Sequence, residues 1–350
     1  MIPENNWPTL LLLWFDENRR ELPWRDEYPR NPYHVWVSEI MLQQTRTEAV
    51  KAYFARWIEQ FPTITALAQA QEEDVLRAWQ GLGYYSRARN LHRAAQTVVL
   101  LHGGILPHDR AALRKLPGIG DYTAGAIASL AFGQKVPAVD GNLLRVLARL
   151  YAVREDVLSS LGKKKITKLA EKTIPAKRPG AFNEALMDLG ADVCIPKTPR
   201  CEVCPLRNQC RAFAENLTQV LPLRKKKAPQ KVFYAAVGIV VHEGSFLFYR
   251  RPERGMLASM WEFPMALSAK GVEEAKAQLE ASLQGAAGEI LWSHKHVFTH
   301  QIWHMTAYRM QGGRPYLGIC SYFTPQQWKA LPLAGPHAKL AAYVEQQNIK

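Results

Sequence analysis

Hydrophobic residues in the first two thirds of the chain recur with the period of an α-helix. Asn31-Pro32 is a strong helix start, because asparagine caps the first turn and proline fixes its φ, and the apolar residues that follow fall on one face. A helix over 32–44 is therefore predicted, and the next one ends before Pro62. The same pattern predicts a first amphipathic helix around residues 10–15 and further helices over 65–79, 86–102, 111–115, 121–132, 142–152 and 181–190.

The pattern changes beyond residue 220. Residues 221–231 hold two prolines and five cations, a composition typical of an extended, solvated linker. The residues that follow predict strands over 233–241 and 246–249, an amphipathic helix over 272–284 and more strand over 290–310. We therefore expect a multidomain protein: an all-α domain over 1–220, a basic linker over 221–231 and an α+β domain over 232–350.

Charge narrows the range of partners. The 350 residues include 45 Lys and Arg against 31 Asp and Glu, so the net charge is +14, which suits a polyanion such as nucleic acid. A basic protein with no nucleic-acid role would also fit this charge. The apolar run Leu10–Phe15 is too short to span a bilayer and no cationic segment precedes it. We expect a cytoplasmic protein, outside the membrane, in a compartment that keeps thiols reduced.

Four of the five cysteines lie within seventeen residues, spaced C-x6-C-x2-C-x5-C. Thiolates this dense indicate a shared metal, either Zn²⁺ or an iron–sulfur cluster, and a disulfide pair is the alternative. Zinc sites favour two CxxC pairs, whereas this array has one. The spacing resembles the [4Fe–4S] loop of the endonuclease III family of DNA glycosylases. The resemblance implies one [4Fe–4S] cluster held by Cys194, Cys201, Cys204 and Cys210.

Leu116-Pro-Gly-Ile-Gly120 resembles the helix-hairpin-helix element of the same superfamily. Gly118 and Gly120 would permit a tight turn and let backbone N–H groups approach a DNA phosphate, although such a segment alone is usually a plain turn. Asp140, in Val139-Asp-Gly-Asn142, precedes a predicted helix and by itself could be an ordinary N-cap. The helix dipole there is expected to lower its pKa. The resemblance implies that Asp140 is the catalytic aspartate.

Val37-Ser-Glu-Ile-Met-Leu-Gln-Gln-Thr45 closely resembles the adenine DNA glycosylases of the MutY family. Among Ile40, Met41 and Leu42, a desolvated Glu39 would have a raised pKa and could donate a proton, unless it faces solvent. At position 122 this chain has tyrosine where bifunctional relatives carry a nucleophilic lysine. A phenol cannot form an imine, so Tyr122 indicates a monofunctional enzyme and could orient Asp140.

Other segments extend the MutY resemblance, which covers about residues 8–345. Gly81-Leu-Gly-Tyr-Tyr-Ser-Arg-Ala-Arg89 supplies aromatic and basic groups close together, although Tyr85 could equally be core. The resemblance implies that Gln44 and Tyr84 wedge into the duplex, with Thr45 and Leu82 nearby. It implies that Arg25 and Glu184 line the adenine pocket and that Asn142 helps to position a water.

The second domain resembles the Nudix-like domain that the MutY family uses to read 8-oxoguanine. The family's lesion-reading loop is Phe-Ser-His, and here it is Phe298-Thr299-His300. Residues 265–290 lack the glutamate-rich magnesium box of active Nudix hydrolases, so pyrophosphohydrolase activity is not expected.

The resemblance, with tyrosine at position 122, therefore implies a monofunctional DNA glycosylase of base excision repair. Its expected substrate is adenine opposite 8-oxoguanine or guanine in double-stranded DNA, and we expect a nucleoid-associated monomer. An endonuclease III-like pyrimidine glycosylase and lyase is the nearest alternative. A non-catalytic DNA-binding iron–sulfur protein is the other alternative, and the Glu39 and Asp140 pair argues against it.

Overall fold

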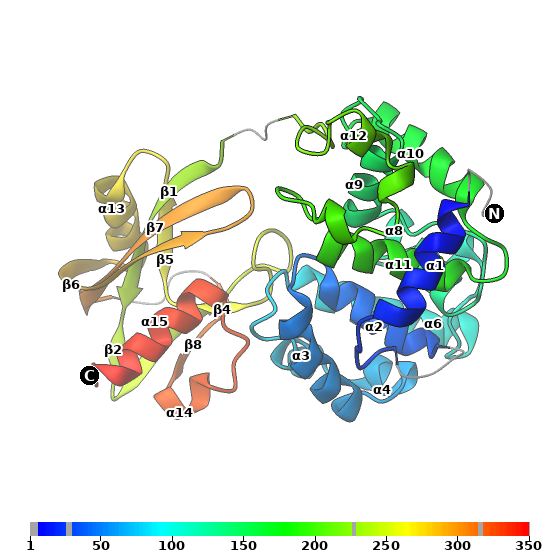
Figure 1. The fold of residues 1–350 in the computed structure, drawn as a ribbon. Coiled ribbons are helices and arrows are strands. Elements are labelled where there is room, and N and C mark those ends of the chain that lie inside the picture. Colours follow the sequence, from blue (N-terminus) through cyan, green and yellow to red (C-terminus); the bar gives the residue numbers. More distant parts are fainter. Residues whose placement is uncertain (1–5, 26–29, 226–228, 314–317, 350) are drawn as a thin grey trace. The chain divides into compact units, whose positions relative to one another are not determined.

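The chain folds into two compact units in a computed structural model that describes residues 6–25, 30–225, 229–313 and 318–349 (Figure 1). One unit comprises residues 1–70 and 89–226, and the other comprises residues 71–88 and 227–350. The segment 71–88 thus groups with the C-terminal unit, although the sequence placed it in the helical domain. Residues 226–228 of the expected linker lie outside the described residues.

The secondary structure elements in the described residues of the first unit are all helices or helical turns. Its helices are α1 (Trp7–Asn18), α2 (Pro32–Leu42), α3 (Thr47–Gln60), α4 (Ile64–Gln69), α6 (Ser86–His102, whose first turn belongs to the other unit), α7 (Arg110–Leu113), α8 (Asp121–Leu130), α9 (Gly141–Leu150), α10 (Ser160–Thr173), α11 (Pro179–Asp188) and α12 (Arg211–Ala214). A π-helical turn, η1 (Leu189–Val193), follows α11, and two 3₁₀ turns, η2 (Cys201–Val203) and η3 (Arg207–Gln209), lie in the cysteine segment.

Three of these elements differ from the sequence prediction. The helix expected over 32–44 ends at Leu42, because Gln43 leaves the helical region with a ψ of 108° and Gln44 then adopts a left-handed φ of 62°. The helix expected over 65–79 is interrupted: Ala70 and Gln71 are extended, so α4 ends there and α5 (Glu72–Ala78) begins anew in the other unit. Helix α10, which was not predicted, starts at a Ser159 side-chain cap.

Helix α11 is the centre of the first unit, since all ten of its residues are buried and it packs against α1, α8 and α9. Its polar residues are therefore held inside the core. Asn183 accepts a hydrogen bond from the Ala138 N–H at 3.0 Å and donates to the Val136 carbonyl at 3.0 Å. These bonds fix the segment that leads into Asp140.

The second unit is an α+β fold. Its described strands are β1 (Lys231–Ile239), β2 (Val241–His242), β3 (Ser245–Arg250), β4 (Trp261–Glu262), β5 (Met265–Ser268), β6 (Gly285–Val297), β7 (Gln301–Gly312) and β8 (Cys320–Phe323). They form one sheet in the order β5-β1-β7-β6 and a second in which β3 pairs with β2, β4 and β8. Strands β1 and β7 are parallel, and the other pairs are antiparallel.

Its helices are α13 (Val272–Leu283), which packs against β1, β5 and β6, α14 (Pro325–Trp328) and α15 (Gly335–Gln346) (Figure 1). The strand expected over 290–310 is the hairpin of β6 and β7, whose turn contains Thr299 and His300. Phe248, Phe263 and Trp303 belong to one hydrophobic core that is shared by strands of both sheets and by α15. No helix in the described ranges is long and apolar enough to cross a membrane.

Candidate active site

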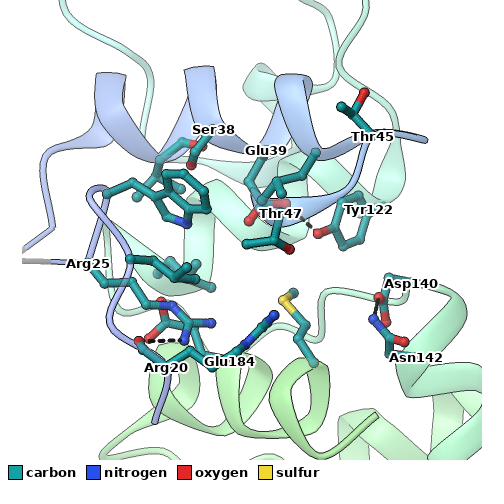
Figure 2. Close-up of a pocket in the computed structure, with 16 residues that line it drawn as sticks. Arg20, Arg25, Ser38, Glu39, Thr45, Thr47, Tyr122, Asp140, Asn142 and Glu184 are labelled. Carbon is teal, nitrogen blue, oxygen red and sulfur yellow. Dashed lines mark hydrogen bonds and ion pairs between the residues drawn. The ribbon is translucent and has the colours of Figure 1, made fainter. Parts of the chain in front are cut away.

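A cavity of about 220 Å³ opens in the first unit between α2, α8, α11 and the start of α9 (Figure 2). Figure 2 shows Glu39 and Tyr122 on one side of it and Asp140 with Asn142 on another. The structure brings together seven of the residues singled out from the sequence: Arg25, Glu39, Thr45, Tyr122, Asp140, Asn142 and Glu184.

Glu39 is a buried acid, with 4% of its surface exposed. It lies in the middle of α2, a helix that is buried along most of its length, so the carboxyl group has lost most of its water. Burial raises the pKa of Glu39 to about 7, and the negative charges of Asp140 and Glu184 act in the same direction. The Tyr122 hydroxyl donates a hydrogen bond to Glu39 Oε2, which opposes part of the rise. This agrees with the expectation drawn from its apolar neighbours.

Asp140 is the N-cap of α9. Its Oδ1 accepts the Leu143 N–H at 2.7 Å, and its Oδ2 accepts the Asn142 side-chain amide at 2.8 Å. The expectation of a lowered pKa is wrong: burial raises the pKa of Asp140, and the hydrogen bonds from Leu143 and Asn142 offset only part of that rise. The prediction that Asp140 caps the helix is correct, but desolvation changes its pKa more than the helix N-terminus does.

A chain of hydrogen bonds continues from Asp140 into the cysteine segment. Asn142 donates to Asp140 and accepts from Arg145 through its Oδ1 at 2.8 Å. Arg145 also donates to the carbonyls of Gly190 and Cys194, each at 2.7 Å. A Cβ on Gly190 would lie 2.6 Å from the Asn142 Cβ, so glycine is needed there. Both the oxygen and the nitrogen of the Asn142 side-chain amide are thereby hydrogen-bonded, so Asn142 holds the Asp140 carboxylate in place.

The opposite wall is a buried ion-pair network. Arg25 lies 2.9 Å from Glu184 and 2.7 Å from Asp188, and Arg20 lies 2.5 Å from Asp188. A further cation, Arg30, lies 3.2 Å from Glu184. Sequence reasoning missed Asp188, although its position four residues after Glu184 on a helix places both carboxylates on one face. The network gives this wall fixed hydrogen-bonding groups inside the core.

Gln44 and Thr45 follow the end of α2. Thr45 lines the cavity and Gln44 does not. In the predicted hairpin between α7 and α8, Gly118 has a φ of 77° and a Cβ there would lie 2.7 Å from the Asn90 Cβ, so glycine is required. Gly120 is different: its φ is −89°, and a Cβ would meet nothing within 4 Å. The tight turn therefore depends on Gly118, whereas Gly120 leaves open space beside the first turn of α8.

The other predicted substrate residues belong to the second unit. Tyr84, with a φ of 48°, is 44% exposed, while Leu82 and Tyr85 are buried, so Tyr85 is a packing residue. Tyr84 shares a hydrogen bond with the Thr299 hydroxyl. In the turn between β6 and β7, Phe298 packs on Trp303, and Thr299 and His300 are exposed.

The four clustered cysteines line one small cavity of about 30 Å³. The described residues contain no group of three or more His, Cys, Asp or Glu side chains arranged to hold a single metal ion. Arg149, which the sequence analysis missed, is 2% exposed and donates to the carbonyls of Ile195, Pro196 and Leu221 at 2.7, 2.7 and 2.9 Å. Its Nη1 also lies 3.4 Å from Cys194 Sγ. Four thiols around one cavity, with a cation beside them, suit a thiolate-bound iron–sulfur cluster.

Comparison with known proteins identifies the family. Residues 37–176 match the HhH-GPD superfamily of base excision DNA repair proteins, and residues 235–343 match the NUDIX domain. An adenine DNA glycosylase of Buchnera aphidicola subsp. Acyrthosiphon pisum is 37% identical over 300 residues, which cover 85% of this chain and 84% of that relative. The chain belongs to the adenine DNA glycosylase family. The Arabidopsis thaliana adenine DNA glycosylase is 42% identical over 73% of this chain, and the chain spans 47% of that relative's length.

Solved structures of other DNA repair enzymes share the fold of the helical part of the chain. A thermostable thymine-DNA glycosylase superposes with a TM-score of 0.55 at 29% identity, covering 61% of this chain and 97% of that structure. An endonuclease III in a non-covalent DNA complex gives 0.52 at 25% identity, covering 62% and 99%. Together with the NUDIX match, these similarities confirm the predicted fold class: a helix-hairpin-helix glycosylase domain followed by a Nudix-like domain.

Proposed function

We propose that this protein is a monofunctional DNA glycosylase of base excision repair that hydrolyses the N-glycosidic bond of adenine paired with 8-oxoguanine or guanine. One observation carries the proposal: Glu39, with a pKa near 7, shares a cavity with the capped carboxylate of Asp140. The names of the adenine DNA glycosylase relatives support the substrate.

Adenine leaves poorly as an anion, so its departure needs a proton. A group with a pKa near 7 is protonated in about half of the molecules at neutral pH, which suits a general acid. Glu39 would protonate N7 of the extruded adenine, and the C1′–N9 bond would then break. The fixed ion pairs of Arg25 with Glu184 and Asp188 supply donors and acceptors for the purine edge.

Asp140 would stabilise the positive sugar that remains after the bond breaks. Its two oxygens are held by Leu143 and Asn142, so the carboxylate does not need to reorganise as charge develops. The Glu39 carboxylate, having given up its proton, would then activate water. The Asn142 amide nitrogen carries a second hydrogen with which to place that water. The arrangement matches the acid and carboxylate pair of glycoside hydrolysis.

Strand cleavage would need an amine nucleophile. No lysine is among the described residues that line this cavity. Tyr122 occupies the position of the nucleophilic lysine of bifunctional relatives, and its hydroxyl donates a hydrogen bond to Glu39. The product would therefore be an intact strand with an abasic site, not a Schiff base.

Contacts outside the cavity would hold the DNA. The hairpin at Gly118 and Gly120 would bind a phosphate, and the wedge residues Gln44 and Tyr84, both with left-handed φ, would replace the extruded base. The exposed turn at Phe298-Thr299-His300 would read 8-oxoguanine. The net charge of +14 favours DNA in general. We further propose that the protein works as a monomer in the cytoplasm, at the nucleoid.

We also propose that Cys194, Cys201, Cys204 and Cys210 hold one [4Fe–4S] cluster. The four thiols share a cavity, and Arg149 ties the neighbouring backbone to α9. When bound, the cluster would cross-link this segment and place its cations against phosphates. The absorbance spectrum of purified protein tests this, since an iron–sulfur protein is brown and a zinc protein is colourless.

A paired-duplex assay tests the catalytic proposal. A duplex with adenine opposite 8-oxoguanine is incubated with the protein, and samples are analysed with and without hot alkali. Adenine release with strand breaks only after alkali is the expected result. Breaks without alkali that equal base release would instead indicate a lyase, and release of a pyrimidine in preference to adenine would reject the substrate.

A further inference from the structure

A second, larger cavity, of about 570 Å³, lies in the same unit as the catalytic one. It forms where the C-terminal end of α8 meets the start of α11 and the last turn of α1. Its volume is in the range of about 300–1,000 Å³ that small-molecule sites occupy. The DNA-binding hairpin proposed above is at the other end of α8, about 15 Å away along a ten-residue helix. The cavity is therefore separate from the phosphate site proposed at that hairpin.

Three cations line this second cavity: Arg19, Lys177 and Arg178. Arg178 forms an ion pair with Asp16 at 2.5 Å, which offsets one charge. No acidic residue is among the lining residues, and no ion pair to Arg19 or Lys177 is found within the described ranges. The mouth therefore keeps an excess of two positive charges, which would attract an anion of about two negative charges, such as a phosphate monoester.

The rest of the wall is apolar and aromatic. Phe132 is half-buried, and its ring packs edge-on against His108, with 5.9 Å between the ring centres. Phe15 forms part of the deep wall and is buried. A half-exposed aromatic ring beside cations suits a ligand that combines a planar ring with a phosphate, since the ring can stack on Phe132.

The two cavities share a thin wall. Leu130 lines both of them. Arg25, which lines the catalytic cavity, places its guanidinium 5.8 Å from the centre of the Phe15 ring, which lines the second one. Consecutive residues Arg19 and Arg20 likewise line different cavities. A ligand in the second cavity would therefore bind beside the catalytic cavity without entering it.

From these observations we infer that the second cavity is a binding site for a nucleoside monophosphate or a similar planar-ring phosphate monoester. The phosphate binds at Arg19, Lys177 and Arg178, and the ring lies against Phe132. The inference goes beyond base excision and does not depend on the catalytic proposal.

The test is equilibrium binding of adenosine monophosphate to the full-length metal-loaded protein, measured by calorimetry and by the rise in Tm. The double variant Arg19→Glu/Lys177→Glu should weaken binding about tenfold or more, because charge-assisted contacts contribute that much. Phe132→Ala should weaken it several-fold, while adenosine without its phosphate should bind weakly. Both charge positions are exposed, so the fold is retained.

A matched control separates this site from general charge and from the catalytic cavity. Lys163→Glu/Lys164→Glu makes the same charge change on the exposed face of α10, outside the cavity, and should leave binding within about twofold. Equal weakening by the control pair would overturn the inference. So would inorganic phosphate binding as tightly as the nucleotide, full affinity in the cavity variants, or neither heat nor a Tm rise at millimolar nucleotide. Adenine excision, measured in parallel, reports the proposed function separately.

Discussion

Raising the pH through neutrality should switch off base excision, because the proposed acid is Glu39. Its pKa is about 7, compared with an ordinary 4.5, and burial is the main cause. Above that pKa, each pH unit lowers the protonated fraction about tenfold. About half of the molecules are protonated at about pH 7, so the single-turnover rate of adenine release should fall about fiftyfold between about pH 7 and about pH 9. The rate is measured with enzyme in excess over duplex, so that changes in DNA affinity do not contribute.

The same shift in pKa has a consequence for stability. The folded protein favours the protonated acid, so this stabilisation is complete below the unfolded pKa and is lost as the pH rises through the folded one. A rise from 4.5 to about 7 corresponds to about 3 kcal/mol of unfolding free energy. Glu39→Gln removes the titration, so the variant should be more stable than the parent at about pH 8, although excision falls about 10²–10⁴-fold. Chemical denaturation at about pH 5 and about pH 8 measures the difference.

Tyr122→Phe provides a matched control. The Tyr122 hydroxyl lowers the pKa of Glu39, so its removal should move the midpoint of the alkaline fall to higher pH. A flat rate profile across neutrality, or a midpoint near 4.5, would refute the assignment of Glu39 as the acid. An unchanged midpoint in Tyr122→Phe would refute the role given to the hydrogen bond.

Four further substitutions test other parts of the site. Asp140→Asn should change the unfolding free energy by less than about 1 kcal/mol, since asparagine also caps helices. It should nevertheless reduce the rate of adenine excision about a hundredfold or more. Comparable rates in the variant and the parent protein would reject the role of the carboxylate. Gly118→Ala should lower the unfolding free energy by about 1–3 kcal/mol, because of its positive φ and the contact with Asn90. Gly120→Ala should leave the unfolding free energy unchanged and weaken DNA binding measured by gel shift. Equal stabilities of the two variants would contradict the turn geometry. Arg149→Met should cost about 1–3 kcal/mol, because it leaves the buried Leu221 carbonyl and the half-buried contacts to Ile195 and Pro196 without their donor. It should also speed bleaching of the iron–sulfur absorbance in chelator, and an unchanged denaturation curve would contradict this.

Much of the helical unit could be predicted from the sequence because its signals are local. Asn31-Pro32 set the start of α2, and the Asn31 side chain does accept the N–H groups of the first turn. The apolar neighbours of Glu39 predicted its burial for the same reason. Local signals failed where the backbone conformation of single residues decided the outcome, as at Gln43, whose ψ of 108° ends the helix early.

The candidate site was less predictable where distant residues meet. The direction of the Asp140 pKa was wrong because the dipole is a local feature, whereas burial depends on how α8, α9 and α11 pack. Arg145 and Arg149 lie one turn apart on α9, but the carbonyls that tie them to the cysteine segment are about forty-five or more residues away. The second cavity likewise forms where the ends of three helices meet, and no short sequence pattern predicts that meeting.

The two proposed recognition surfaces differ in how freely they can change during evolution. Helix α11, which supplies Glu184 for the excised base, has no residue at the surface, so a new choice of base there requires coordinated changes in several neighbouring helices. The turn at Thr299 and His300 is exposed at the tip of a hairpin and can vary one residue at a time. Specificity for the lesion opposite the excised base can therefore change between lineages while specificity for the excised base stays the same.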